Sequence, residues 1–536
     1  MNVRIALVAS VSVIALAAAG CSGSGGGTQT QPSAAAGGAG IPQAGGNLVV
    51  AISGAPDTLD PAFTGSKYTT YTLPNLCERL FDVDQELNVV PQLAAELPKV
   101  SKDGKTYTLK IRTGLKFNDG TDFDAEAVKV NLDRYRNHPR SAEAPNLANV
   151  EDVEVVDDET VELTLSAPTA PLTSVLANRS GMMASPTQLK KLGDKFGDEP
   201  VCVGPFAFVS RPSADTINLK KSEYYYDKDV VKLDTATFQV ISQPNVRATN
   251  LRSGDIQAAI DIAPTDVESL KSDQNIAVND LVSLGFQLIT INVANKSGSG
   301  KPPYSPVDSA LAKADLRKAF ELSLDRNAIN QVVYGGTKVP GCSPLSPASP
   351  WYTEIPCAAQ DIEQAKQLVA ASGVATPIPV TLTIQAANDQ QSKLGTVIQA
   401  MGKEAGFDVK IKATESATGG DEAMAGTFDA YMNSWSGRID PDQNMTMFWS
   451  PSSALNYSGA DYDDINKLMA QARSTNDDAE RKELYAQIAT KMAEAGNYMI
   501  LFHDSLTMGI RKDVTGLQYY SDGVIRLKEA ALTTGG

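Results

Sequence analysis

The side chains best suited to catalysis or metal binding are few and lie far apart in this 536-residue sequence. Histidine occurs only at His138 and His503, so the His-Glu-x-x-His motif and the Cys/His spacing of zinc sites are both absent. Residues 298–301 (GSGK) run into Pro302 and lack the glycine spacing of a phosphate-binding loop, and no Gly-x-Ser-x-Gly motif occurs. We therefore predict no catalytic residue, no metal and no cofactor, with a secreted hydrolase as the alternative from the enzyme class.

The N-terminus has the composition of a secretory signal that ends at a cysteine. A single basic residue, Arg4, precedes the apolar residues 5–19, a run too short to span a bilayer comfortably. Ala18-Ala19-Gly20-Cys21 resembles a bacterial lipobox, in which the cysteine thiol is acylated, although Ala18 stands where Leu is usual. We predict a signal peptide over residues 1–20 and a lipid anchor on Cys21, at the outer face of the bacterial cell membrane.

The segment after Cys21 differs in composition from the rest of the chain. Residues 22–46 carry no charged side chain and consist mostly of Gly, Ser, Ala and Gln, which cannot form a core, so we predict a flexible tether over residues 21–46. The roughly 490 residues that follow exceed what one hydrophobic core usually supports, which predicts two or more lobes. The net charge of −16 argues against nucleic acid as a partner and against membrane contact other than through the anchor.

Four cysteines remain once Cys21 is set aside, and a secreted chain meets an oxidising environment. Without any Cys-x-x-Cys spacing, disulfides are favoured over metal sites. Cys342 and Cys357 bracket a proline-rich loop, and closing a loop of that size stabilises by about 3 kcal/mol on the chain-entropy model. Pairing of Cys77 with Cys202 follows only by elimination, with two buried free thiols as the alternative.

Hydrophobic periodicity predicts a mixture of strands and helices in the mature chain. Residues 106–111 and 160–165 alternate apolar and polar side chains after Asp-rich turns, as half-buried antiparallel strands do, and residues 381–384 read as a further strand. Helical stripes cover residues 316–324, 362–369 and 465–472, the second of which stops at Gly373. This order predicts a mixed α/β or α+β fold.

A series of short motifs spans nearly the whole mature chain. They are residues 54–61 (GAPDTLDP), 91–94 (PQLA), 103–107 (DGKTY), 117–121 (FNDGT), 125–128 (AEAV), 203–206 (VGPF), 251–256 (LRSGDI) and 315–319 (DLRKA). In this order they resemble the family 5 extracellular solute-binding proteins, the group that includes the dipeptide, oligopeptide and nickel-binding receptors of ABC importers. Several of these motifs have the residues of tight turns, so we assign them no role in ligand binding.

The resemblance implies a two-lobed periplasmic-binding-protein fold that encloses its ligand in a cleft between lobes that close about a hinge. We place the first lobe at residues 47–284 with a subdomain inserted at about 90–198, the second lobe at 285–500, and a return segment at 501–536. The implied function is the extracellular substrate-binding component of an ABC importer, a monomer that captures a small peptide-like ligand and passes it to the permease subunits. An opine, a nickel chelate, an oligosaccharide or an iron carrier are the alternative ligands.

Two segments that line the cleft in the family can be located in this sequence. One is the loop after the first strand, Ser53-Gly54-Ala55, where a glycine lets backbone approach a ligand, with a plain turn before Pro56 as the alternative. The other runs from Ser434 and Trp435 through Ser436 and Gly437 to Arg438, and in peptide-binding members the strand around this Trp pairs with the peptide backbone. Phe286 and Trp351 are further candidates, for which core packing is the equal alternative.

The position three residues after the Trp departs from the family pattern. Peptide receptors carry there an Asp that neutralises the α-ammonium group, whereas this chain has Arg438. Either a one-residue deletion shifts that role to Asp440, or Arg438 presents its guanidinium fork to an anionic group of the ligand. A third possibility is that Arg438 pairs only with Asp440 or Asp442.

Overall fold

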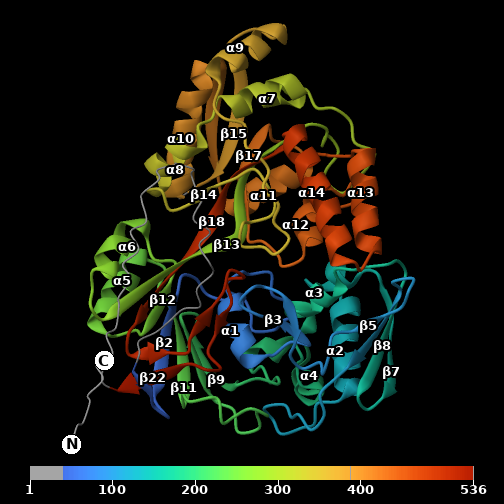
Figure 1. Cartoon of the computed structure of the whole chain (residues 1–536), viewed down its shortest axis with the longest axis vertical. Coiled ribbons are helices and arrows are strands. Elements are labelled where there is room, and N and C mark those ends of the chain that lie inside the picture. Colours follow the sequence, from blue (N-terminus) through green and yellow to red (C-terminus); the bar gives the residue numbers. More distant parts are fainter. Residues whose placement is uncertain (1–39, 387, 535–536) are drawn as a thin grey trace, which may run out of the picture. The chain divides into compact units, whose positions relative to one another are not determined.

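The computed structural model describes residues 40–386 and 388–534, so the predicted signal peptide, Cys21 and residues 22–39 of the predicted tether lie outside the described residues (Figure 1). The main element is an 11-stranded mixed sheet. Its strands follow one another in the order β16 (Phe407–Thr414), β15 (Ile378–Gln385), β17 (Ala430–Trp435), β13 (Ile276–Ile291), β18 (Tyr498–Arg511), β12 (Ala258–Ile260), β2 (Asn47–Ile52), β11 (Thr235–Val240), β10 (Thr216–Lys221) and β9 (Phe206–Ser213), with β14 (Val339–Pro340) paired to β18.

Two strands in the middle of this sheet are much longer than the others. β13 and β18 pair antiparallel and connect the β16-β15-β17 part of the sheet to the β12-β2-β11 part (Figure 1). Their register is broken at two places, and at the larger break Val282 faces Ser505 while Phe286 faces His503. This leaves three residues of β13 opposite one of β18, a bulge that bends the ribbon and redirects side chains. Ser283 and Leu284 of the bulge, with Asp504 opposite them, line the cavity described below.

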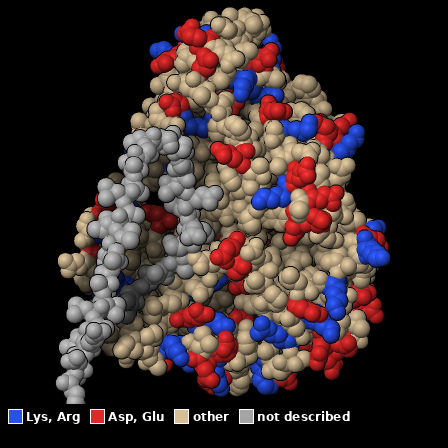
Figure 2. Space-filling view, viewed as in Figure 1, with Lys and Arg blue, Asp and Glu red and all other residues tan. Residues whose placement is uncertain are grey.

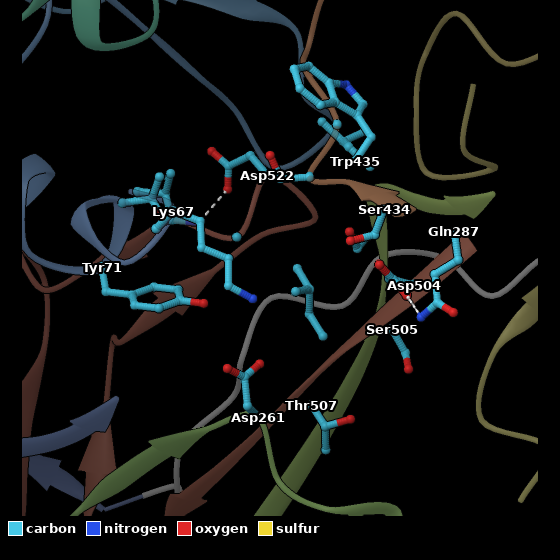
Figure 3. A pocket seen from close by; sticks show the side chains of 18 of the residues that line it. Lys67, Tyr71, Asp261, Gln287, Ser434, Trp435, Asp504, Ser505, Thr507 and Asp522 are labelled. Atoms are coloured by element: carbon cyan, nitrogen blue, oxygen red, sulfur yellow. Dashed lines mark hydrogen bonds between the residues drawn. The ribbon is translucent and has the colours of Figure 1, made fainter. Parts of the chain in front are cut away.

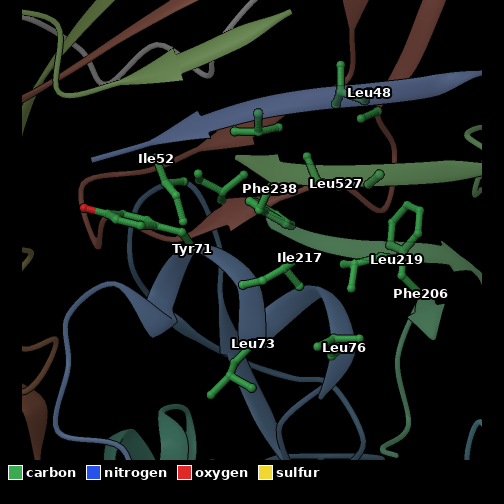
Figure 4. Close-up of a cluster of buried hydrophobic side chains, with 14 of the residues drawn as sticks. Leu48, Ile52, Tyr71, Leu73, Leu76, Phe206, Ile217, Leu219, Phe238 and Leu527 are labelled. Atoms are coloured by element: carbon green, nitrogen blue, oxygen red, sulfur yellow. The ribbon is translucent and has the colours of Figure 1, made fainter. Parts of the chain in front are cut away.

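The β2-β11-β10-β9 part of the sheet packs on α1 (Thr69–Leu76). Figure 4 shows the resulting core, in which Leu48, Ile52 and Phe238 of the sheet meet Leu73 of the helix and all are fully buried. Leu527, from the C-terminal end of the chain, belongs to the same core. The last strands therefore complete a core begun at the N-terminal end; they are β19 (Val514–Thr515), β20 (Gln518–Tyr519), β21 (Ile525–Arg526) and β22 (Ala531–Thr534).

A separate four-stranded sheet has its own core. Its order is β5 (Lys99–Val100), β6 (Thr106–Lys110), β8 (Thr160–Leu165) and β7 (Val150–Asp157). Helix α2 (Ala125–Asn137) packs on it, and its start is capped by the Asp124 carboxylate, which accepts a hydrogen bond from the Ala127 amide. Short elements connect this part to the rest: β3 (Phe81–Val83), β4 (Val89–Pro91), α3 (Leu172–Leu176) and α4 (Pro186–Leu192).

Two helical layers cover the other half of the main sheet. One shares a core with β15 and β16 and consists of α7 (Ala314–Leu322), α8 (Arg326–Tyr334), α9 (Ile362–Ala371) and α10 (Asp389–Glu404). The other consists of α12 (Pro441–Trp449), α13 (Asp463–Ser474) and α14 (Asp478–Ala495), which pack together. The remaining helices are α5 (Pro244–Ser253), α6 (Pro264–Lys271) and α11 (Ser416–Ala425). None of the helices in the described residues is long and apolar enough to cross a membrane.

The structure confirms the predicted mixed α/β fold and corrects one boundary. The two strands predicted from alternation are β6 and β8, which pair with each other, and the three helical stripes lie on α7, α9 and α13. Both predicted cysteine pairs are disulfides, Cys77 with Cys202 and Cys342 with Cys357. The predicted tether extended too far, because Ile41–Pro42 forms β1 and pairs with β22. Backbone pairing needs no charged or apolar side chain, so composition did not indicate it.

Candidate ligand-binding site

A cavity of about 780 Å³ lies beside the bulge of the β13–β18 ribbon (Figure 3). Its volume suits a small ligand such as a short peptide. The lining comes from widely separated parts of the chain, including α1, β13, β17, β18 and the loop after β12. Five of the predicted site residues line it, all in one run: Ser434, Trp435, Ser436, Gly437 and Arg438.

Strand β17 carries the start of this run to the cavity. Along its whole length it pairs antiparallel with β13, from Ala430 opposite Ile291 to Trp435 opposite Phe286. On its other side β15 pairs with Ala430 and Tyr431 only. Within the described residues, the second edge of β17 from Met432 to Trp435 therefore has no strand partner, which leaves backbone groups available to an extended ligand.

Trp435 is held in a fixed orientation beside the cavity. Its indole Nε1 donates a hydrogen bond to Asn444 Oδ1 (2.9 Å), and its ring meets the Phe448 ring edge-on with 5.3 Å between centroids. The Arg438 guanidinium lies 4.4 Å from the Trp435 ring centroid, within cation–π distance. The indole is thus half-buried, with neighbours that fix its plane.

Arg438 is a half-buried cation without a carboxylate partner in the described part of the chain. Its Nη1 donates to Ser436 Oγ (2.9 Å) and to the Gly437 carbonyl (2.6 Å), and its backbone amide donates to Asn444 Oδ1 (2.7 Å). Burial, followed by repulsion from Arg179 and opposed by Glu143, lowers the pKa of Arg438 to about 10. The guanidinium therefore stays charged at neutral pH.

Asp440 does not line the cavity and belongs to an internal ion-pair network. Both of its oxygens accept from Arg481 Nη2 (2.9 and 3.0 Å), and one caps α12 by accepting from the Asp442 amide (2.9 Å). Asp442 in turn is paired with Arg473 through two hydrogen bonds of 2.8 and 2.9 Å. With these partners Asp440 is fully buried, so we remove it from the ligand-binding set, and neither Asp is the partner of Arg438.

The predicted loop Ser53-Gly54-Ala55 lies behind the cavity wall and not among its lining residues. Ser53 Oγ donates to Asp261 Oδ2 (2.5 Å), and Asp261 does line the cavity. A Cβ at Gly54 would lie 2.4 Å from Cζ of Tyr68, which is too close for any side chain. The glycine therefore makes room for the Tyr68 ring, whereas the prediction assigned that space to a ligand.

Phe286 and Trp351 also lie away from the cavity lining. Phe286 is 1% exposed and packs against Phe448, with 6.1 Å between ring centroids. Trp351 is half-buried against the same core and is covered by the Arg481 guanidinium, 4.9 Å from its ring centroid. Both residues therefore pack in or against the core, which was the alternative to ligand contact.

A polar chain on β13 and β18 contributes to the cavity and was missed from the sequence. The Asp504 Oδ1 oxygen accepts from Gln287 Nε2 (2.9 Å) and from Lys338 Nζ (2.8 Å). Figure 3 shows Asp504 and Gln287 at the cavity with Ser505 and Thr507. One sequence feature could have predicted these residues: the polar residues 503–505 interrupt a mostly apolar strand. Apolar strands rarely carry an acid without a specific partner or function.

The opposite wall contains a buried arginine beside an acid in an unusual conformation. Arg247, in α5, is 1% exposed and donates to the carbonyls of Ile241 (2.6 Å), Ser242 (3.1 Å) and Asp261 (2.5 Å). Burial lowers the pKa of Arg247. Asp261 follows β12 with a positive φ of 52°, a conformation that residues other than glycine adopt rarely. The arginine holds this strained turn in place at the cavity wall.

A metal site requires several ligating side chains at one place. Among residues 40–386 and 388–534, no group of three or more His, Cys, Asp or Glu side chains is arranged to hold a metal ion. The polar groups of the cavity instead suit hydrogen bonding and ion pairing with an organic ligand.

Comparisons with known proteins agree with this geometry. Residues 88–456 match the family described as bacterial extracellular solute-binding proteins, family 5. The chain is 28% identical over 507 residues to the glutathione-binding protein GsiB of Escherichia coli K12, covering 91% of this chain and 94% of GsiB. Two solved structures share the fold. The substrate-binding protein CtaP of Listeria monocytogenes is 22% identical, with a TM-score of 0.80 over 92% of this chain and 100% of CtaP. DppA of Helicobacter pylori, in complex with the peptide STSA, is 23% identical, with a TM-score of 0.77 over 92% of this chain and 99% of DppA. The chain therefore belongs to the family 5 bacterial extracellular solute-binding proteins, the non-catalytic substrate-binding proteins of ABC transporters.

Proposed function

We propose that this protein captures a small peptide-like ligand in the cavity beside β17 and delivers it to the permease subunits of an ABC importer. The observation that carries the proposal is the edge of β17 from Met432 to Trp435, which has no strand partner among the described residues and lies next to a cavity of about 780 Å³. An extended peptide can add to such an edge through its own amide and carbonyl groups. Because β13 fixes β17 on the other side, the edge is preorganised.

Related proteins support a peptide-like ligand. GsiB is named for glutathione, and DppA of H. pylori was crystallised with the peptide STSA. Glutathione and short peptides are therefore the first ligands to test. The alternative ligands for the same receptor are an opine, a nickel chelate, an oligosaccharide and an iron carrier.

We further propose that the β13–β18 ribbon is the hinge between two lobes. In this proposal residues 47–284, with the inserted part at about 90–198 and the return segment 501–536, form one lobe, and residues 285–500 form the other. The separate cores on either side of the ribbon support this division.

We also propose that acylation of Cys21 holds the receptor at the membrane. Mass spectrometry of protein made in a lipoprotein-processing host tests this proposal, and an unmodified Cys21 would contradict it.

The peptide proposal is tested with ligands whose backbone is altered. We expect native mass spectrometry to find a peptide-like compound retained by the purified protein, and titration calorimetry to detect binding of tripeptides. N-methylation of one tripeptide amide at a time should weaken binding about tenfold at the positions that pair with β17, because each methyl group removes a donor. If tripeptides and glutathione do not bind while a sugar or a metal chelate does, the peptide proposal is wrong.

A further inference from the structure

The cavity has a charge balance opposite to that of the whole protein. Six cationic and three anionic side chains line it, whereas the chain carries a net charge of −16. Where Figure 2 leaves the surface uncovered, acidic and basic side chains are interspersed. An acidic protein that collects cations around one cavity creates a local field that favours an anion there.

Half of these six cations are set aside because of their partners, which leaves Lys67, Arg179 and Arg438. Lys338 pairs with Asp504, Arg79 pairs with Asp82, and Arg247 is used by backbone carbonyls. Arg438 makes no ion pair within the described part of the chain. It is therefore the arginine of the lining whose charge is least compensated.

Arg438 shares the cavity lining with a second arginine. Arg179, in the 3-10 turn Arg179–Gly181, lines the same cavity and repels Arg438 strongly enough to help lower its pKa. Its Nε donates to Glu143 Oε1 (2.9 Å). In the residues described, Nη1 and Nη2 of Arg179 and Nε and Nη2 of Arg438 make no hydrogen bond, so both guanidinium groups keep donors for a ligand.

Glu143 does not neutralise both arginines. It is 2% exposed, and its oxygens accept from Arg179 Nε (2.9 Å), Asn146 Nδ2 (2.9 Å) and Ser180 Oγ (2.6 Å). These three donors hold it beside Arg179, and it forms no ion pair with Arg438. Arg179 thus has a fixed carboxylate partner, whereas Arg438 has no ion-pair partner in the described residues, so an anionic group of a ligand would balance the second charge.

We infer that this cavity selects ligands with an acidic group, which Arg438 and Arg179 bind together. The inference deepens the proposed function and rests on it for the peptide scaffold: the ligand would be a peptide or amino-acid conjugate whose carboxylate lies between the two guanidinium forks, which suit bidentate contact with a carboxylate. Arg438 comes from the chain after β17 and Arg179 from the part that packs on the four-stranded sheet. A carboxylate that binds both would relieve their repulsion and tie these two parts together.

Titration calorimetry with matched acids and neutral analogues tests the inference. The probes are alanine tripeptide and its C-terminal amide, tripeptides with Glu or Gln in place of one alanine, glutathione, and an N-carboxyalkyl amino acid with free or esterified carboxylates. We expect the best acid to bind about tenfold or more tightly than its own neutral analogue, since a hydrogen bond to a charged group is stronger than a neutral one. Arg438→Gln and Arg179→Gln should each remove this preference, and Arg438→Lys should restore part of it.

Arg140→Gln is the matched control, because Arg140 is an exposed arginine paired with Asp194 outside the cavity lining, and it should leave the preference unchanged. If tripeptides bind but acid and amide bind equally, the inference fails while the peptide proposal stands. If only the N-carboxyalkyl amino acid binds, and does so through Arg438, the inference holds while the peptide proposal fails. Retention of the preference in Arg438→Gln, or no binding of any acidic probe at about 1 mM, overturns the inference.

Discussion

Replacing Arg481 by methionine should destabilise the region around the binding strand by several kcal/mol. The Arg481 side chain is 4% exposed and that of its partner Asp440 is fully buried, with hydrogen bonds of 2.9 and 3.0 Å between them. Methionine fills much of the same space but leaves the carboxylate buried and unpaired. Breaking such a pair costs about 3–5 kcal/mol, more than the pair itself contributes.

The effect should depend on pH in a defined direction. Burial, and secondarily Asp442, already raises the pKa of Asp440 against the opposing effect of Arg481. Without Arg481 the pKa of Asp440 in the folded state rises further above that of the unfolded chain. The folded protein then binds a proton that the unfolded chain releases, so stability falls as pH rises through this interval. The destabilisation by Arg481→Met should therefore be larger at pH 7.5 than at pH 5.

Urea unfolding followed by tryptophan fluorescence measures this region selectively. All three tryptophans, Trp351, Trp435 and Trp449, pack in or against the core that α12, α13 and α14 share.

The double variant Asp440→Asn/Arg481→Met should recover part of the lost stability, because it removes the buried charge. Lys412→Met, which breaks the exposed pair with Glu422, should cost at most about 1 kcal/mol. A loss below about 1 kcal/mol in Arg481→Met would show that Asp440 is not an uncompensated buried charge.

Three further changes test other parts of the structure. Asn444→Ala removes the amide that holds the indole and the cationic loop of the cavity, so calorimetry should show ligand affinity reduced about tenfold with the fold retained. Gly54→Ala places a Cβ 2.4 Å from the Tyr68 ring and should lower the urea midpoint, whereas a ligand-contact role would lower affinity alone. Replacing Cys77 and Cys202 together by Ser opens a loop closed over 125 residues and should cost about 2–5 kcal/mol, measured by urea unfolding against the oxidised wild type.

The parts of the fold that could be predicted are those with local signals. Strict alternation at residues 106–111 and 160–165 predicted β6 and β8, because a strand with one buried face repeats every two residues. The 16-residue β13 was not predicted as one element, because its ladder is broken by the bulge and its burial does not alternate. The β13–β18 pairing joins residues more than 200 positions apart, and no local pattern encodes such a contact.

The candidate site was predictable where it forms one continuous run and not where it is assembled from distant segments. Residues 434–438 were found because the family resemblance applies to one continuous run, whereas Arg179 and Asp504 join them only through the tertiary fold. A buried hydrogen-bond partner such as Glu143 decides whether a cavity arginine is already neutralised. That partner lies 36 residues from Arg179 in sequence, so spacing alone does not reveal it.

A helix-start signal in the sequence decides whether Arg438 or Asp440 lines the cavity, and it decides this better than the spacing from Trp435 does. Asp440 is followed by Pro441, and an Asp before a Pro is the usual start of a helix, with the acid as N-cap and the proline in the first turn. A residue committed to that role turns its carboxylate toward helix amides, where Arg481 reaches it as well. Arg438 precedes the helix, next to Gly437 with its φ of 74°, and no capping role holds it away from the cavity. Local helix chemistry therefore turns the acid away from the cavity, and the arginine is the charged side chain of this loop that lines it.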